Sequence, residues 1–320
     1  MGGVGLPRLG YLLPTRERVM EGQPETRPLL ALAERAEALG FDSLWVGDSL
    51  LARPRHDALT LLAAVAARTH RAELGTAVLL PALRNPVLLA HQVATLDRIA
   101  EGRVILGVGI ASDWPNIRAE FEAAGVPFDK RIGRLLEGLA LCRVLWSGKE
   151  INWPQNGEGR WNVKSAVLGP TPHRPGGPPI WIAGAVPAAR ARAGRHFDGW
   201  FPNSATAAEY GPQWAEVQAA GRAAGRDPSK LTPATYLTLA IDDDQARADA
   251  RLNAYLERYY GMPPGETRKR QKSYAGAAAG AAAWLKGYAD AGATHIVLRF
   301  AGDHERHLET AARIRRDLGW

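Results

Sequence analysis

Apolar residues along the chain follow one repeated order: a helical stretch, a glycine, and then a short run of β-branched or aromatic residues. The first example has helical apolar spacing over residues 29–39, then Gly40, then a strand-like run over residues 41–46. A glycine after a helix favours a left-handed end, and a short apolar run after such a turn is typical of a buried strand. The pattern therefore predicts a helix, a tight turn and a strand.

The same order returns three more times, which indicates a repeated unit. The repeats are residues 87–100 with Gly102 and a strand over 103–108, residues 188–193 with Gly194 and a strand over 197–201, and residues 281–291 with Gly292 and a strand over 294–299. Further strand-like runs cover 9–13, 74–80, 179–183 and 235–241, which brings the predicted strands to eight.

Eight alternating units predict an α/β fold, a single (β/α)₈ TIM barrel over residues 1–320, because parallel strands need helical crossovers. A doubly wound sheet is the alternative, since a count of strands does not show closure. We expect insertions in the strand-to-helix loops at about 147–178, with a hairpin over 159–168, and at about 262–280. In a barrel those loops open on the carboxyl face, where active sites are built.

The charge balance raises nucleic-acid binding as a competing hypothesis. The chain has 40 Lys and Arg against 33 Asp and Glu, a net charge of +7, although 46% apolar and 23% charged residues are ordinary for a globular protein. The densest basic run, residues 268–272, is short, and most other arginines are scattered. A solvated surface segment explains such a run, so we expect no nucleic-acid partner.

Cysteine use and the amino terminus bear on the compartment. The single Cys142 cannot form an internal disulfide and has the apolar neighbours of a small buried residue. Residues 1–6 lack a basic stretch followed by an apolar core, and no apolar run reaches the roughly 18 residues that a membrane helix needs. We therefore expect a cytoplasmic protein with no membrane partner.

Several common site signatures are missing from the chain. The run of residues 107–112 lacks the third glycine of a dinucleotide fingerprint, and no Walker loop, Gly-x-Ser-x-Gly elbow or two-by-two cysteine set occurs. His304 and His307 flank Glu305, but their spacing is one residue short of a zinc-binding helix. We expect no metal, and interpret the two histidines as the solvent-facing start of a helix capped by Asp303.

Three predicted strand ends have small residues that leave room for a ligand to approach the backbone. Gly107 and Gly109 close the fourth strand, where a ligand or another backbone must come close; packing at the barrel mouth is the alternative. Residues 183–185, Ala-Gly-Ala, precede a helix whose free amides could face a phosphate, or form a plain tight turn. Residues 75–78, Gly-Thr-Ala-Val, lie in the third strand and could also form a bulge.

At these residues the sequence resembles the bacterial luciferase-like monooxygenase superfamily, whose members bind FMN or the deazaflavin F420 in a (β/α)₈ barrel. The likeness runs in the same order from about residue 9 to residue 308. The matching phrases are GFDSLWVGD at 40–48, LGTAVLLP at 74–81, RNPVLLA at 84–90, TLDR at 95–98, GRVILGVG at 102–109, PIWIAG at 179–184 and DGWFP at 198–202.

The resemblance implies how each segment serves the cofactor. Similar proteins have a non-prolyl cis peptide in the third strand, against the flavin ring, and residues 75–78 match it. The cofactor-binding residues that the resemblance implies are Asp48, Gly75, Thr76, Ala77, Ile110, Ala111, Gly184 and Ala185. Of these, Gly184 and Ala185, together with Ile110 and Ala111, match positions that hold the phosphate and ribityl chain, and Asp48 matches a residue beside the deazaflavin ring.

Two departures from the family concern proton transfer. Many F420-dependent relatives have a His directly after the Asp, where this chain has Ser49, and some have a Glu where it has Ser112. A general acid or base needs a pKa near the working pH, which Ser does not supply unaided. We name Ser49 and His56, in the same loop, as the catalytic candidates; His56 is otherwise a loop residue before the predicted cap Asp57.

The resemblance implies an oxidoreductase acting on a small organic substrate. With F420, which we prefer, the reaction is a hydride transfer; with reduced FMN it is a monooxygenation. The alternative is a non-catalytic flavin- or ligand-binding barrel. Relatives are often dimers, so a homodimer is expected.

Overall fold

Eight parallel strands form a closed barrel within residues 6–155 and 157–320, the parts of the chain that the computed structural model describes. Residues 1–5, on which the expectation about the amino terminus partly rests, lie outside the described residues. The barrel strands are β1 (Arg8–Leu12), β2 (Ser43–Val46), β3 (Glu73–Thr76), β4 (Val104–Val108), β7 (Ile180–Ile182), β8 (Gly199–Trp200), β9 (Thr232–Ile241) and β11 (His295–Phe300).

Closure depends on the pairing of β8 with β9. Gly199 lies beside Thr232 and Trp200 beside Pro233, and the remaining neighbours follow chain order around the ring until β11 pairs with both β9 and β1. The predicted TIM barrel is therefore confirmed. The closed ring excludes the doubly wound alternative, because an open sheet would leave β8 and β9 on separate edges.

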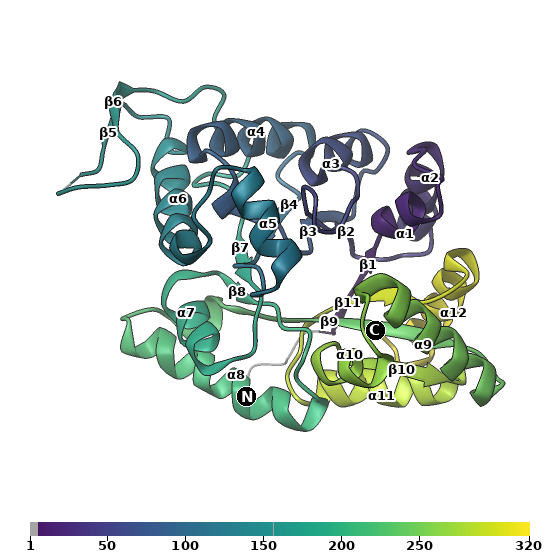
Figure 1. The fold of residues 1–320 in the computed structure, drawn as a ribbon. Helices are drawn as coiled ribbons and strands as arrows, with labels where there is room; N and C mark the ends of the chain where they lie inside the picture. Colours follow the sequence, from purple (N-terminus) through teal and green to yellow (C-terminus); the bar gives the residue numbers. More distant parts are fainter. Residues whose placement is uncertain (1–5, 156) are drawn as a thin grey trace.

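Helices surround the barrel (Figure 1). Those that follow the barrel strands are α1 (Thr15–Met20), α2 (Arg27–Ala38), α3 (Ala58–Ala66), α4 (Pro86–Ile99), α6 (Arg131–Leu145), α7 (Pro187–His196), α8 (Ala207–Ala223), α11 (Ala278–Asp290) and α12 (His304–Asp317). Additional elements are α5 (Pro115–Ala123), α9 (Gln245–Tyr260), α10 (Pro264–Arg270), β10 (Ser273–Gly276) and the short 3-10 turns Pro81–Leu83, Phe128–Lys130 and Pro228–Lys230. No helix among the described residues combines the length and the hydropathy needed to cross a membrane.

The glycines that were predicted to end helices act in two ways. Gly40, Gly102 and Gly292 have φ values of +89°, +80° and +99°, the left-handed conformation expected after a helix. Gly194 instead lies inside α7, where a Cβ would overlap the backbone of α8 at Val217. The prediction of a helix end at Gly194 is wrong, because this glycine lets two helices pack closely.

The two insertions belong to different kinds of connection, one from a strand to a helix and the other from a helix to a strand. Residues 262–280 contain α10 and β10 and follow β9 and α9, so they belong to a strand-to-helix connection as predicted. Residues 147–178 follow α6 and precede β7, so their predicted position in a strand-to-helix loop is wrong. Their hairpin pairs β5 (Ile151–Trp153) with β6 (Val163–Ala166) and is wider than the predicted 159–168.

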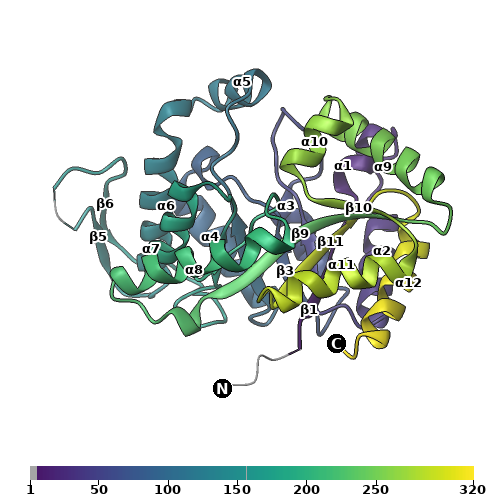
Figure 2. The ribbon, with the colours of Figure 1, turned by 90° about the horizontal axis from the view of Figure 1, so that it is seen from below.

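The two ends of the barrel differ in what covers them. Figure 2 shows α5 and α10 at the end opposite the start of β1 and the end of α12. They meet near Trp114, whose ring lies 5.4 Å from the Arg270 guanidinium carbon. Because β1 enters the barrel at the other end, α5 and α10 border the carboxyl face.

Candidate active site

A cavity of about 290 Å³ opens at the carboxyl ends of the barrel strands. Its walls come from the residues that follow β2, β3, β4, β7 and β8, and from β9, α9 and β11. The predicted site residues that line it are Asp48, Ser49, Ala77, Ile110, Ala111 and Gly184. The others, His56, Gly75, Thr76 and Ala185, are not among the described residues that line this cavity.

Gly75 and Thr76 lie below the cavity floor and shape it. A Cβ at Gly75 would overlap the ring of Trp45, and the Thr76 hydroxyl donates to the Gly107 carbonyl at 2.8 Å. Trp45 packs in turn against Phe201, with ring centroids 4.9 Å apart and the planes tilted by 36°, and Phe201 lines the cavity. These residues therefore support the floor through packing inside the barrel.

The floor itself is the turn that follows β3. The peptide bond between Ala77 and Val78 is cis, in the segment where the family resemblance implies such a bond. A Cβ at Gly109 would lie 2.6 Å from Val78 Cγ2, and one at Gly107 would overlap the Thr76 carbonyl. The two glycines thus let β4 pack against this turn, and Gly109 also lines the cavity.

Asp48, at the end of β2, is held by an ion pair. Its carboxylate accepts from Arg84 Nη1 at 2.6 Å and Nη2 at 2.9 Å, and from the Leu80 amide at 2.9 Å. Its side chain is only 2% exposed. The pair joins the end of β2 to the turn after β3, so Asp48 fixes the floor that it borders.

Ser49 is tied to a buried glutamate. Its hydroxyl donates to Glu120 Oε1 at 2.7 Å, and the same oxygen accepts the amides of Leu51 at 2.8 Å and Ala52 at 3.2 Å. Glu120, on α5, is 1% exposed. The Glu120 carboxylate on α5 therefore fixes the loop after β2. The Ser49 hydroxyl is one of the groups through which it does so.

His56 points away from the cavity. Its Nε2 lies 2.6 Å from the Pro24 carbonyl, to which the ring N–H donates. Asp57 directly after it caps α3, as expected, by accepting the Thr60 amide at 2.9 Å. The structure therefore does not bring His56 together with the residues at the cavity.

The turn after β7 has the features of an anion site. Gly184 has φ +113°, and its carbonyl accepts from Trp200 Nε1 at 2.8 Å. The following helix α7 begins at Pro187, after the N-cap Val186, with no side chain capping its first amides. The amides of Ala189 and Arg190 donate to the Val186 carbonyl, which leaves Ala188 as the helix amide that can face a ligand. The guanidinium of Arg190 contacts the Ala185 carbonyl and pairs with Glu216 at 2.8 Å. An amide at a helix start favours an anion such as a phosphate.

The wall opposite this turn consists of tyrosine and arginine side chains that the sequence analysis missed. Arg299, at the end of β11, is 1% exposed, and its guanidinium carbon lies 4.5–5.4 Å from four tyrosine rings. Those rings belong to Tyr236, Tyr255, Tyr259 and Tyr260. The available signal was a charged residue at the carboxyl end of an otherwise apolar barrel strand, a position that indicates function.

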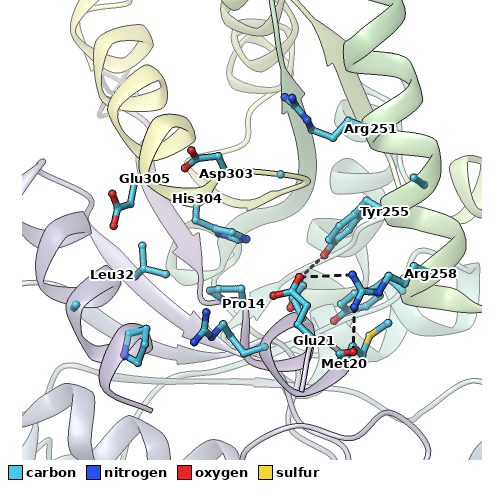
Figure 3. A pocket seen from close by; sticks show the side chains of 17 residues that line it. Pro14, Met20, Glu21, Leu32, Arg251, Tyr255, Arg258, Asp303, His304 and Glu305 are labelled. Carbon is cyan, nitrogen blue, oxygen red and sulfur yellow. Dashed lines mark hydrogen bonds and ion pairs between the residues drawn. The ribbon is translucent and has the colours of Figure 1, made fainter. Parts of the chain in front are cut away.

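A second, larger cavity of about 740 Å³ lies between α1, α2, α9 and the start of α12 (Figure 3). Two of its acidic groups have partners within the cavity: Arg258 lies 3.7 Å from Glu21, and the Tyr255 hydroxyl donates to Glu17. Tyr259 lines both cavities. The smaller cavity is the candidate active site, because it collects the predicted residues at the strand ends.

His304 and His307 do not form a solvent-facing helix start, so that expectation is wrong. His307 is 1% exposed, and its Nε2 accepts the Ile241 amide at 2.9 Å. His304 Nδ1 lies 2.8 Å from the Tyr11 hydroxyl, and burial lowers its pKa to about 3. The predicted cap is present, since Asp303 accepts the Arg306 amide at 3.1 Å. Phe300 packs against both imidazole rings and Tyr11 against that of His304, although His304 also borders the second cavity.

The closed barrel and the cavity at its carboxyl face define a protein of the TIM-barrel class with a concave site at the strand ends. The chain matches the model of the luciferase-like monooxygenase family over residues 7–319, and it belongs to that family.

Named relatives agree with this assignment. The chain is 31% identical over 310 residues to the F420-dependent glucose-6-phosphate dehydrogenase of Amycolatopsis mediterranei (strain U-32), covering 88% of this chain and 91% of the relative. It is 32% identical over 277 residues to the phthiodiolone/phenolphthiodiolone dimycocerosates ketoreductase of Mycobacterium sp. (strain JLS), covering 77% and 71%. A solved F420-dependent secondary alcohol dehydrogenase in complex with an F420-acetone adduct shares the fold, with TM-score 0.82, 22% identity and coverage of 98% and 99%. The predicted family and the prediction of an oxidoreductase are confirmed.

Proposed function

We propose that the protein is an F420-dependent oxidoreductase that moves a hydride between the deazaflavin and a carbonyl or alcohol carbon of a small organic substrate. The cofactor named for one relative, and the ketoreductase and sugar dehydrogenase activities named for the two, support this choice. The observation that carries it is the cavity at the carboxyl face, with the cis turn of Ala77 and Val78 as its floor and the Gly184 turn on its rim.

The residues present fit such a cofactor. The Gly184 turn and the Ala188 amide at the start of α7 can face a phosphate, and the guanidinium of Arg190, paired with Glu216, lies against the same turn. Ala77, Ile110 and Ala111 line the space between that turn and the cavity floor. Ala111 has φ +62°, which keeps the chain close to the cavity at the end of β4.

When bound, F420 supplies the two-electron hydride chemistry. The protein supplies position and an enclosed environment. Asp48 and Glu120 hold the two loops beside the cavity, and Phe201 closes its floor over the packed barrel interior. Arg53, Arg55 and Arg299 make the opposite wall positive, which favours an anionic cofactor or substrate.

A titration tests the proposal. Purified protein receives F420 and FMN in separate experiments, and fluorescence quenching measures each dissociation constant. We expect F420 to bind much more tightly, and the loaded protein to oxidise or reduce at least one member of a panel of alcohols and ketones. Tighter binding of FMN would favour the monooxygenase reaction instead, and no measurable binding of either cofactor would overturn the proposal.

Three finer statements belong to the same proposal. We infer that the protein acts in the cytoplasm, that it forms a homodimer, and that it binds neither nucleic acid nor membrane. In support, the basic run at residues 268–272 is partly neutralised: Arg268 pairs with Asp249 at 3.0 Å and Lys269 with Glu266 at 2.6 Å. Analytical ultracentrifugation and a salt-dependent filter-binding assay test the second and third statements.

A further inference from the structure

Tyr259, on the last turn of α9, lies where three arginines converge. Arg55 Nη2 donates to its hydroxyl at 3.2 Å. The guanidinium carbons of Arg16 and Arg299 lie 4.7 Å and 4.5 Å from the centroid of its ring. Tyr259 is 5% exposed and lines the candidate active site. The phenol is therefore surrounded by positive charge at the cavity wall.

These three arginines lack carboxylate partners. Over residues 6–155 and 157–320, neither Arg16, Arg55 nor Arg299 forms an ion pair with an acidic side chain, whereas Arg84 nearby pairs with Asp48. The acid closest in sequence, Glu17, accepts a hydrogen bond from Tyr255 instead. Buried positive charge is costly unless a negative group balances it. A phenolate at Tyr259 would provide that balance.

Arg55 connects the phenol to the cavity floor. A Cβ at Gly47 would overlap Arg55 Nη1 and would lie 3.5 Å from the Ala77 carbonyl oxygen. The guanidinium thus occupies the space that glycine leaves at the end of β2, beside the cis turn, and its other nitrogen reaches the Tyr259 hydroxyl. This contact holds the hydroxyl on the wall beside the floor of the cavity.

We propose that Tyr259 transfers the proton in the reaction of this enzyme, and that Arg55 is the residue that positions it. The inference rests on the proposed function. It assigns the proton transfer to Tyr259, because neither Ser49 nor His56 is placed to perform it. The hydroxyl of Ser49 is bonded to Glu120, and His56 lies outside the cavity.

The charges around the phenol support ionisation at a lower pH than that of an ordinary tyrosine. Burial alone raises the pKa of Tyr259, but the guanidiniums of Arg55, Arg299 and Arg16 outweigh burial and the opposing charge of Glu17, so the pKa lies below its usual value. Other polar groups on the elements packed around it include Arg53, Tyr236, Tyr255 and Tyr260, and Arg258, Glu21 and His304 line the second cavity with it. Burial raises the pKa of Tyr236 and of Tyr255, so those two phenols stay protonated.

The proposed step balances. In the oxidative direction the O–H bond of an alcohol breaks and its proton passes to the phenolate oxygen of Tyr259. The C–H bond of the same carbon gives its hydride to the bound deazaflavin, which is reduced while the alcohol becomes a carbonyl. In the reverse direction the Tyr259 hydroxyl returns the proton to the carbonyl oxygen as the hydride arrives.

The first test needs no cofactor. The ultraviolet absorbance of tyrosinate is followed against pH in the wild-type protein, in Tyr259→Phe and in the control Tyr274→Phe, which changes a tyrosine outside both cavities whose hydroxyl donates to the Ala277 carbonyl. We expect one phenol to ionise below pH 10 in the wild type and in Tyr274→Phe, and this phase to be missing in Tyr259→Phe. An unchanged titration in Tyr259→Phe overturns the proposal.

The second test measures the rate against pH, with F420 and the alcohol or ketone that reacts fastest in the panel. Tyr259→Phe is expected to lower the rate about 10²–10⁴-fold and to remove the pH dependence due to this group, while F420 binding stays intact. Arg55→Gln should move that pH dependence upward by about 1–3 pH units, because it removes the nearest positive charge. Tyr274→Phe, outside both cavities, should keep the wild-type pH profile.

The outcomes separate the two proposals. If F420 does not bind the wild-type protein, the proposed function fails, whatever the tyrosinate titration shows. If F420 binds and Tyr259→Phe keeps both the rate and its pH dependence, only the role of Tyr259 fails. In that case the unpaired arginines serve the anionic ligand alone.

Discussion

The two walls of the active-site cavity are built in different ways. One wall, formed by the ends of β3, β4 and β7, is made of backbone and small residues such as Ala77, Gly109 and Gly184. The other, formed by α9, β9 and β11, is made of large charged and aromatic side chains, with Arg299 and Tyr259 at its centre. The first wall can hold a cofactor by shape and free amides, whereas the second can hold or move charge.

The difference between the walls also predicts how substitutions on each of them act. On the backbone wall, added atoms collide: a Cβ at Gly107 overlaps the Thr76 carbonyl. On the side-chain wall, atoms can be removed without blocking the cavity. Substitutions on the first wall should therefore act on cofactor binding, and those on the second on charge and proton transfer.

The largest effect is expected at Gly184, on the backbone wall. Gly184→Asp should weaken F420 binding about 1000-fold, because it places a carboxylate beside the phosphate and adds backbone strain at φ +113°. Gly184→Ala, the matched control, adds the strain alone and should cost about 10-fold. Fluorescence titration measures both. Equal affinities of the two variants would show that this turn does not face the phosphate.

A second prediction concerns the loop that joins the two walls. Glu120→Ala should lower the free energy of unfolding by about 3 kcal/mol, because it leaves several loop amides and the Ser49 hydroxyl without their acceptor. Hydrogen exchange over residues 49–52 should become faster. Glu122→Ala, an exposed position on the same helix, is the control and should change neither quantity. Unchanged exchange in the loop would mean that Glu120 does not hold it.

The sequence predicted the backbone wall far better than the side-chain wall, for a physical reason. Gly184 is needed where the chain turns, and that need depends on neighbours in sequence. Gly109 is needed because Val78 packs close to it, but it lies in a strand phrase that the family resemblance matches. Tyr259 meets Arg55, 204 residues away, and within its own helix it looks like an apolar core position beside Leu252 and Leu256. Only the closed barrel brings these residues together. The wrong prediction at Gly194 has the same origin, because it depends on how α7 packs on α8. The error at residues 147–178 concerns the order of elements, because α6 ends before this insertion begins.

A third prediction tests the barrel interior beneath both walls. Burial, together with the charge of Arg8, lowers the pKa of His295 to about 3, and its Nε2 lies 2.7 Å from the Ser43 hydroxyl. The unfolded chain, with an ordinary histidine pKa of about 6.5, binds the proton more readily than the folded protein. Stability should therefore be complete above pH 6.5 and fall by about 1.4 kcal/mol per pH unit from this group as the pH drops toward 3.

Chemical denaturation at several pH values measures that slope. His295→Gln should reduce it by the contribution of one histidine, whereas His91→Gln, at an exposed position, should leave it unchanged. A wild-type slope that His295→Gln does not alter would show that the imidazole is protonated in the folded protein. The histidine would then need a buried counter-charge in place of Ser43.

The smallest effect is expected at the rim of the side-chain wall. Arg53 lies 5.1 Å from the Tyr260 ring and 6.0 Å from the Trp114 ring, half-buried at the cavity. Arg53→Gln should weaken F420 binding only about 3-fold, and the difference from wild type should vanish at high salt, because an exposed charge is screened. Arg258→Gln, at the second cavity, is the control and should leave the affinity unchanged at both salt concentrations. If Arg53→Gln weakened F420 binding as much as Gly184→Asp does, the side-chain wall would also bind the cofactor. The proposed division of roles between the two walls would then be wrong.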